Sequence, residues 1–219
     1  MFFEQYVNTL VKTRLGHCFI FSAPSGCGKS TIVKRLCEMD SRLVTSVSTT
    51  TRPKRSDEIE GQHYYFVSDT EFDTMVANEE FLECATVFKH RYGTRRKIVS
   101  KLLHNGFDVL FDIDWQGART VKQRAANVVS FFLIPPSLEE LKRRLSTRGQ
   151  DSLTSVEYRM SQATDELTHY DEFDYVIVND DLGRACDLIH TCIEWTRRGE
   201  HYSAPSFNRT LKEVLEPEK

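Results

Sequence analysis

The sequence predicts an α/β domain in which a mainly parallel sheet is flanked by helices, and three observations support this prediction. A glycine-rich stretch, APSGCGKS at residues 23–30, stands between an apolar run and a helical pattern. Short apolar runs typical of buried parallel strands alternate with helical patterns along the chain. One of these runs, residues 108–114, ends in carboxylates, as strands do where they open on a ligand-binding crevice.

Length and composition are those of one globular domain. With 219 residues, of which 40% are hydrophobic and 28% charged, the chain can bury a sizeable core. A formal net charge of −3 argues against a general nucleic-acid or membrane binder. We see no secretory leader and no apolar run of membrane-spanning length, and therefore expect a cytoplasmic protein. The six cysteines form no Cys-x-x-Cys pair, so we expect reduced, mostly buried thiols.

Residues 23–30 match a Walker A phosphate-binding loop, with Ala23 in place of the first glycine. Backbone at Gly26 and Gly28 can aim N–H groups at a phosphate, and the following helix adds the positive end of its dipole. Lys29 can reach the outer phosphates, and the Ser30 hydroxyl can ligate Mg²⁺. The alternative is a glycine-rich turn that binds nothing.

The segments around this loop form the first part of the predicted core. Residues 1–16 are a polar, weakly helical lead-in, and residues 17–22 form the strand that feeds the loop. The helix after the loop runs to about Met39, and a short strand follows at residues 43–47.

A hydroxyl-rich and basic segment, residues 48–55, changes the character of the chain. Its proline excludes a continued helix. Arg52 and Arg55 stand three apart beside four hydroxyls, which suits a second phosphate. From spacing alone, a solvated basic loop is an equal alternative.

Aromatic strand candidates follow at residues 61–67 and 81–88, with a helix start at Ser68 between them. Tyr92-Gly93-Thr94 is then expected to turn into a helix over residues 97–104. These signals predict a small strand-rich insert within the parallel core.

The core resumes with the strand at residues 108–114. Asp114 is our candidate for the acidic partner of Mg²⁺, acting through water as a Walker B aspartate does. The alternative is that Asp112 and Asp114 both cap the helix that starts near Gly117. The next strand, residues 128–134, is stopped by two prolines.

A pair of helices carrying arginines follows. Ser137 and Glu140 predict a capping box at the first of them. These arginines allow two interpretations. They either lie on an ordinary solvent-exposed helix face or belong to a mobile lid that closes over the transferred phosphoryl group. The residues are Arg144, Arg148 and Arg159.

A last strand at residues 175–178 leads into Asn179 and a helix that ends near Arg198. The predicted organisation is one domain with a core at 17–47, 96–136 and 170–198, an insert at 48–95, a lid at about 137–169, and tails at 1–16 and 199–219.

The order and spacing of these motifs resemble the guanylate kinase family over roughly residues 17–198. The matching stretches are SAPSGxGKS at 22–30, SxTTRxxR at 48–55, GxxY at 61–64, FxE at 81–83, YGT at 92–94, DIDxQG at 112–117, RG at 148–149 and VNDD at 178–181. The resemblance implies a P-loop nucleoside-monophosphate kinase fold. It also implies Mg²⁺-dependent transfer of the γ-phosphoryl group of ATP to GMP, giving ADP and GDP.

The resemblance further implies which residues hold each substrate. For ATP they are Ala23, Pro24, Ser25, Gly26, Cys27, Gly28, Lys29 and Ser30, with Asn179 near the adenine. For GMP they are Arg52, Arg55, Tyr64 and Tyr92 at the phosphate, and Ser48, Glu83, Thr94 and Asp112 around the guanine. The implied catalytic residues are Lys29, Arg52, Arg144, Arg148 and Arg159. The metal is held by Ser30 and, through water, by Asp114.

Physical chemistry agrees with the implied choice of base. A carboxylate such as Glu83 accepts from both N1–H and the 2-amino group of guanine, whereas adenine offers neither donor. The GMP phosphate is already a competent nucleophile, so catalysis requires alignment and charge neutralisation without a general base or a covalent intermediate.

Three positions depart from the family pattern. Asp57 replaces a usual glycine at a turn, Arg95 follows Tyr-Gly-Thr where a small residue is common, and Cys27 stands inside the phosphate loop. Asp tolerates a left-handed backbone, so the turn can survive. Arg95 either adds a phosphate contact or removes a hydroxyl near the base. Surrounding N–H donors predict a reactive thiolate at Cys27, and the alternative is a small spacer pointing away.

The expected partners are ATP and GMP, with dGMP left open, and neither nucleic acid nor membrane. The chain is expected as a monomer or a small homo-oligomer. Two rivals remain: a kinase for another monophosphate, and a non-catalytic guanylate-kinase-like module.

Overall fold

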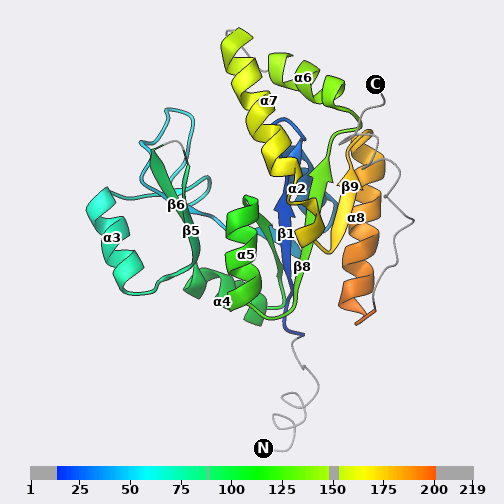
Figure 1. The fold of residues 1–219 in the computed structure, drawn as a ribbon. Coiled ribbons are helices and arrows are strands. Elements are labelled where there is room, and N and C mark those ends of the chain that lie inside the picture. The colour runs from blue at the N-terminus through cyan, green and yellow to red at the C-terminus, as the bar shows by residue number, and fades with distance from the viewer. Residues whose placement is uncertain (1–13, 88, 148–152, 201–219) are drawn as a thin grey trace, which may run out of the picture.

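The computed structural model describes residues 14–87, 89–147 and 153–200 (Figure 1). The strands are β1 (Cys18–Ser22), β2 (Leu43–Thr45), β3 (Thr49–Thr50), β4 (Tyr65–Phe66), β5 (Phe81–Val87), β6 (His90–Arg95), β7 (Asp108–Asp112), β8 (Val128–Ile134) and β9 (Tyr175–Val178). The helices are α2 (Lys29–Met39), α3 (Asp69–Ala77), α4 (Arg96–His104), α5 (Trp115–Arg124), α6 (Leu138–Thr147), α7 (Leu153–Leu167) and α8 (Leu182–Arg197), with a short 3-10 helix η1 (Tyr170–Glu172).

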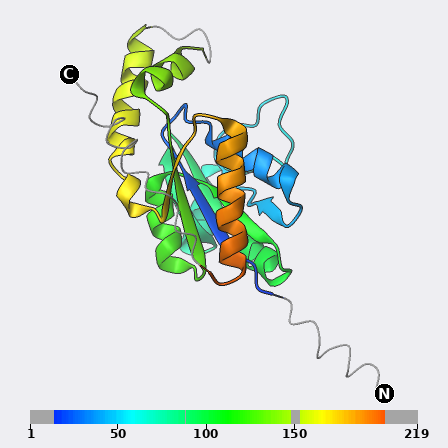
Figure 2. The ribbon, with the colours of Figure 1, turned by 90° about the vertical axis from the view of Figure 1, so that its right-hand side faces the viewer.

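The core is a five-stranded parallel sheet in the order β2-β7-β1-β8-β9. The central strand β1 is buried along its whole length, which explains why it reads as an unbroken apolar run. Phe19 and Phe21 pack with α2 and α8, whereas Cys18 and Ile20 pack with α4 and α5 on the other face. Figure 2 shows α8 lying across the first of these faces. The predicted α/β class is confirmed.

A second sheet of four strands, in the order β4-β3-β6-β5, stands beside the core together with α3 (Figure 1). Two expectations for this part were wrong. The strand expected over residues 61–67 is reduced to β4, and the expected turn at Tyr92-Gly93-Thr94 is the middle of β6. Strand β6 pairs antiparallel with both β3 and β5, so its neighbours in space, more than its own pattern, make it a strand.

Helices α6 and α7 project beyond the carboxyl ends of the core strands (Figure 1). Only half of the predicted capping box forms at α6, because the Glu140 N–H donates to the Ser137 hydroxyl at 3.1 Å while the Glu140 carboxylate turns to Arg143 and Arg144. Those two guanidinium groups hold the pKa of Glu140 down at about 2. Arg148 lies outside the described residues.

Two further features concern membrane spans and cysteines. In residues 14–200, apart from the gaps named above, no helix is long and apolar enough to cross a membrane. All six cysteines lie in described segments and none is in a disulfide. Four are buried, Cys37 is half-buried and Cys84 is exposed, so the prediction of mostly buried thiols is confirmed.

A buried ion network joins the ends of three core elements. Arg197, at the end of α8, is only 3% exposed and donates to Asp108 Oδ2 at 2.7 Å and to Asp40 Oδ2 at 2.5 Å. Glu194 completes the arrangement by pairing with Arg197 and Arg42. Burial alone would raise the pKa of Asp40 and of Asp108, but their hydrogen bonds hold both pKa values below the ordinary range.

Replacing Arg197 with methionine should therefore destabilise the fold by about 3 kcal/mol at pH 7, because three carboxylates lose their common partner. A carboxylate whose pKa is depressed by folding contributes stability above its unfolded pKa of about 4, and that stability is lost as the pH falls. The difference between the two proteins should therefore shrink below about pH 4 in urea titrations.

The matched control is Arg35→Met, since Arg35 pairs with Glu38 on the exposed surface. That variant should change the free energy of unfolding by less than about 1 kcal/mol. Equal losses in the two variants would contradict the structural role given to Arg197.

Candidate active site

The glycine-rich loop has the backbone that a phosphate cradle requires. Gly26 and Gly28 adopt φ values of 91° and 85°, in the left-handed region that favours glycine. A Cβ atom at Gly28 would also lie 2.6 Å from Asn179 Nδ2. That amide donates to the Cys27 carbonyl at 2.7 Å, so the end of β9 fixes the shape of the loop.

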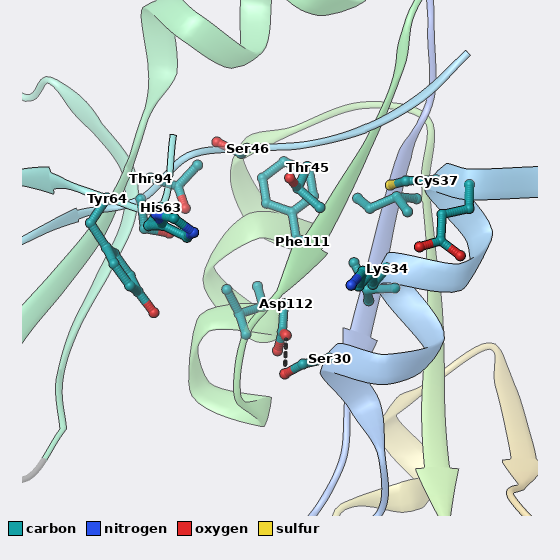
Figure 3. Close-up of a pocket in the computed structure, with 15 residues that line it drawn as sticks. Ser30, Lys34, Cys37, Thr45, Ser46, His63, Tyr64, Thr94, Phe111 and Asp112 are labelled. Carbon is teal, nitrogen blue, oxygen red and sulfur yellow. Dashed lines mark hydrogen bonds between the residues drawn. The ribbon is translucent and has the colours of Figure 1, made fainter. Parts of the chain in front are cut away.

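Lys29 and Ser30 begin α2 and both meet Asp112 at the end of the neighbouring strand β7. Lys29 Nζ lies 3.0 Å from Asp112 Oδ1 and donates to the Ile113 carbonyl at 2.9 Å. The Ser30 hydroxyl donates to Asp112 Oδ2 at 2.8 Å, as Figure 3 shows. A hydroxyl and a carboxylate this close are oxygen donors of the kind that Mg²⁺ prefers.

Asp114 lies elsewhere, although it is only two residues further along. It is the N-cap of α5 and accepts from the Gly117 N–H at 2.8 Å. A Cβ atom at Gly117 would be 3.4 Å from Asp114 Oδ1 and 3.4 Å from Glu83 Oε2. The capping alternative thus describes Asp114 but not Asp112, and the two aspartates face different parts of the site.

Glu83 and Thr94 form a buried pair on facing strands β5 and β6. The Thr94 hydroxyl donates to Glu83 Oε1 at 2.6 Å, and Glu83 is only 5% exposed. Burial raises the pKa of the Glu83 carboxyl; the Thr94 hydroxyl lowers it, and the nearby charge of Asp114 raises it further. A buried carboxylate with unused acceptor capacity is suited to a ligand that brings N–H donors.

Arg52 is held among aromatic rings and one acid. Its guanidinium bonds Glu58 Oε1 at 2.5 Å and lies 5.4 Å from the centroid of the Tyr64 ring. Tyr64 in turn meets Tyr92 edge to face, with 5.9 Å between ring centroids. The bond from Arg52 lowers the pKa of Glu58 to about 2, so the pair is fully ionised at neutral pH. Arg55 lies beside it, exposed, with its N–H on Glu58.

One cavity of about 620 Å³ lies between the pair of Ser30 and Asp112 and the side chains of Tyr64 and Thr94, whereas Glu83, Arg52 and Asp114 are not among the residues that line it. In Figure 3, Tyr64, His63 and Thr94 line one side, Lys34 and Cys37 the other, and Asp112 and Ser30 lie between them. Ser48, which we expect around the guanine, also lines this cavity. Sequence reasoning missed Lys34, whose position one turn after Ser30 on α2 was the available signal.

A second cavity, of about 460 Å³, lies on the other side of the phosphate loop. Its lining includes Gly26, Gly28, Arg144 and Asn179. Arg144 Nη2 donates to the Asn179 carbonyl at 3.0 Å, which ties α6 to the end of β9. Arg159 lies on α7, so both described arginines of the expected lid are on these projecting helices.

Two of the positions that depart from the family pattern, Arg95 and Asp57, lie in described segments. Arg95 points to the opposite face of its sheet from Thr94, where Arg95 Nε donates to Thr49 at 2.9 Å and the guanidinium lies 4.4 Å from the Tyr65 ring centroid. The expected effects of Arg95 on the pocket therefore stay predictions. Among the described residues, the non-glycines with positive φ do not include Asp57, so the turn there needs no left-handed residue.

Cys27 corrects a further expectation. Its side chain is fully buried and packs with Leu141, Leu145 and Ala163 of α6 and α7. This burial raises the pKa of the thiol to about 12, which is the opposite of the reactive thiolate that the loop's N–H groups predicted. The spacer alternative describes the structure.

In an alkylation time course read by peptide mass spectrometry, Cys84 should react first because it is exposed, and Cys27 should react last. Adding nucleotide should change the Cys27 rate little, since the fold already covers it. Rapid Cys27 labelling that ATP blocks would restore the reactive-thiolate interpretation.

Glu166 is a neighbour of the phosphate loop that sequence reasoning missed. Burial raises the pKa of its carboxyl, while Lys29 and the Ser25 N–H lower it. The available signal was its position on α7 between the core residues Ala163 and Leu167, which directs a carboxylate inward.

Comparisons with known proteins agree with this geometry. The guanylate kinase family model matches residues 16–196. The chain is 45% identical to guanylate kinase of Rhodopseudomonas palustris (strain BisB5) over 206 residues, 93% of this chain and 94% of that one. It is 46% identical to guanylate kinase of Rickettsia prowazekii (strain Madrid E) over 178 residues, 81% of this chain and 90% of that one.

A solved structure is also similar. The crystal structure of guanylate kinase from Anaplasma phagocytophilum matches with a TM-score of 0.68 and 35% identity, covering 91% of this chain and 95% of the other. The family match spans both sheets and the helices that carry the site. This chain is therefore a member of the guanylate kinase family.

Proposed function

We propose that this protein catalyses the Mg²⁺-dependent transfer of the γ-phosphoryl group of ATP to GMP, giving ADP and GDP. The observation that carries the proposal is a single cavity that runs from the phosphate-loop residue Ser30 to Thr94, the partner of the buried acceptor Glu83. One end suits the phosphates of a donor nucleotide. The other suits a base that presents N–H groups.

The donor nucleotide is assigned to the phosphate loop and to the cavity beyond it. Loop N–H groups and the start of α2 favour phosphate oxygens, and Lys29 neutralises their charge. Asn179, between this cavity and the loop, is the proposed neighbour of the adenine. Arg144 and Arg159 would contact the phosphates from α6 and α7, with Arg148 as a third contact inferred from the sequence.

The acceptor nucleotide is assigned to the strand-rich insert. Arg52, Arg55, Tyr64 and Tyr92 would hold its phosphate, and Arg52 exchanges its bond to Glu58 for that phosphate. Glu83 would accept from guanine N1–H and the 2-amino group. The Ser48 hydroxyl can donate to O6. Thr94 has a single hydroxyl hydrogen, so it would have to release its bond to Glu83 in order to donate to O6.

The two aspartates take exchanged roles relative to the assignment made from sequence. We place Asp112 with Ser30 at the metal, because these side chains already meet at 2.8 Å. We place Asp114 at the guanine, because it lies beside Glu83. When bound, Mg²⁺ would neutralise phosphate charge and orient the donor phosphates.

The chain's own residues supply alignment and charge neutralisation. Lys29, Arg52 and the arginines of α6 and α7 surround the path between donor and acceptor phosphates. Closure of those helices would exclude water, so the phosphoryl group passes to GMP instead of being hydrolysed. No protein nucleophile is needed, since the GMP phosphate oxygen attacks directly and in line.

The test is ADP release from Mg·ATP with GMP, AMP, UMP, CMP and dTMP offered separately. We expect turnover with GMP alone and its loss when Mg²⁺ is chelated. Turnover with another of these nucleotides would keep a kinase and discard the base pocket. No turnover with any would favour a binding module that uses the same fold. A dGMP arm would settle the preference at the ribose.

The compartment and assembly follow as smaller proposals. Six unpaired thiols are typical of a reducing cytoplasm, and we place the protein there. A monomer or a small homo-oligomer is the assembly to be measured by light scattering.

A further inference from the structure

The segment that follows α7, from His169 to the end of η1 at Glu172, is held against α5 by four side chains. The ring of His169 stacks on Trp115 with centroids 3.7 Å apart and an angle of 14° between the planes. The guanidinium of Arg119 lies 4.5 Å from the centroid of the same indole. Trp115 therefore contacts a ring and a cation at once, an arrangement that its π system favours.

Glu172 closes the arrangement from the next turn of the chain. Arg119 donates to both Glu172 carboxylate oxygens at 2.6 Å, and His169 Nδ1 lies 2.7 Å from Oε1. Lys122 adds a bond to the Glu172 carbonyl at 2.7 Å. We call Trp115, Arg119, His169 and Glu172 the α5–α7 clamp. Its bidentate guanidinium bond fixes orientation as well as distance.

The clamp joins two segments that each continue into one of the proposed nucleotide sites. On the α5 side, Trp115 directly follows Asp114, the N-cap beside Glu83. On the α7 side, His169 comes three residues after Glu166, whose charge interacts with Lys29 and the Ser25 N–H of the phosphate loop. Residues 166–169 thus interact with the phosphate loop through Glu166 and with Trp115, the neighbour of Asp114 in sequence, through His169.

We propose that His169 and Trp115 are positioning residues that form the fixed hinge of the α6–α7 helices. The inference rests on the proposed function and deepens it. The hinge sets the position of α7 and its partner α6 over the phosphates, relative to the base pocket. These helices carry Arg159 and Arg144. Neither His169 nor Trp115 contacts substrate in this proposal. Their loss should therefore affect the alignment of the transfer step more than the binding of GMP.

The first measurement is steady-state kinetics on the full chain. His169→Ala should lower kcat by about fivefold or more through loss of the stack. KM for GMP should stay within about twofold of the parent value, because the residues that bind GMP are unchanged. His169→Phe keeps an aromatic ring on Trp115 and should recover most of kcat. Thr168→Ala, which removes only a local bond to the Asp165 carbonyl, is the matched control.

The second measurement needs no turnover. Hydrogen–deuterium exchange of the free protein should be faster over the end of α7 and η1 in His169→Ala than in His169→Phe or Thr168→Ala. Adding GMP and a non-hydrolysable ATP analogue should protect α7 in the parent protein, and less so in His169→Ala.

The outcomes separate the hinge from the activity on which it rests. Equal kcat in the parent, His169→Ala and Thr168→Ala proteins, with GMP turnover intact, would overturn the hinge alone. A parent protein that turns over none of the nucleotides would overturn the proposed function. Unchanged exchange in His169→Ala would then overturn the hinge as well.

Discussion

Replacing Lys29 with methionine should lower kcat by about 10³-fold or more, because one fixed positive charge leaves a site whose chemistry is charge neutralisation. Lys29 donates to the Ile113 carbonyl at 2.9 Å and pairs with Asp112 at 3.0 Å. It begins α2, but the residues that bury this helix in the core are Ile32, Val33 and Leu36. The fold should therefore persist. ADP release at saturating ATP and GMP measures kcat, and circular dichroism measures Tm.

The matched control is Arg35→Met, which removes a positive charge from the exposed face of the same helix. Its kcat should equal that of the parent protein. If Lys29→Met retained kcat within about tenfold of the parent while Arg35→Met matched it, Lys29 would not be the charge that the transfer requires.

The sequence predicted the parallel core well because its signals are local. An unbroken apolar run before Gly26 and Gly28 specifies a buried strand, then a loop, then a helix. Strand β6 could not be predicted from local signals. Tyr92, Gly93 and Thr94 have no strand pattern of their own, and they become a strand through pairing with β3 and β5. That pairing depends on residues distant in the sequence.

Motif matching also brought out five residues that line the cavity, but it could not separate the two aspartates. The five are Ser30, Ser48, Tyr64, Thr94 and Asp112. Asp112 and Asp114 differ by two positions, so both would share a face if the strand continued. The strand ends at Asp112, and Asp114 turns to cap α5. Where one strand stops thus decides which carboxylate meets Ser30 and which lies beside Glu83.

Cys27 is a second position where the local sequence was not enough for a correct prediction. The local sequence surrounds the thiol with N–H donors and a lysine, which predicts a lowered pKa. The structure packs Leu141 and Leu145 against it from α6, a helix more than a hundred residues later, and burial then outweighs the nearby charges. Reactivity at this position is set by tertiary packing.

Replacing Glu83 with glutamine should lower kcat/KM for GMP by about 10²-fold or more and leave the low value for AMP unchanged or raised. A carboxylate offers two acceptors to guanine N1–H and the 2-amino group. Glutamine keeps one acceptor and places a donor against a donor, which leaves buried polar groups unpaired. The measurement is kcat/KM for GMP and AMP in the same assay.

The pH profile gives this prediction a second, independent readout. Burial raises the pKa of Glu83, so its ionised form is lost at a higher pH than for an exposed glutamate. In the parent protein kcat/KM for GMP should fall as the pH drops through that raised pKa. The limb should vanish in Glu83→Gln. It should persist in Glu80→Gln, which changes an exposed neighbour outside the cavity. Full GMP preference in Glu83→Gln would show that another group reads the base, and Asp114, beside Glu83, would be the next residue to replace.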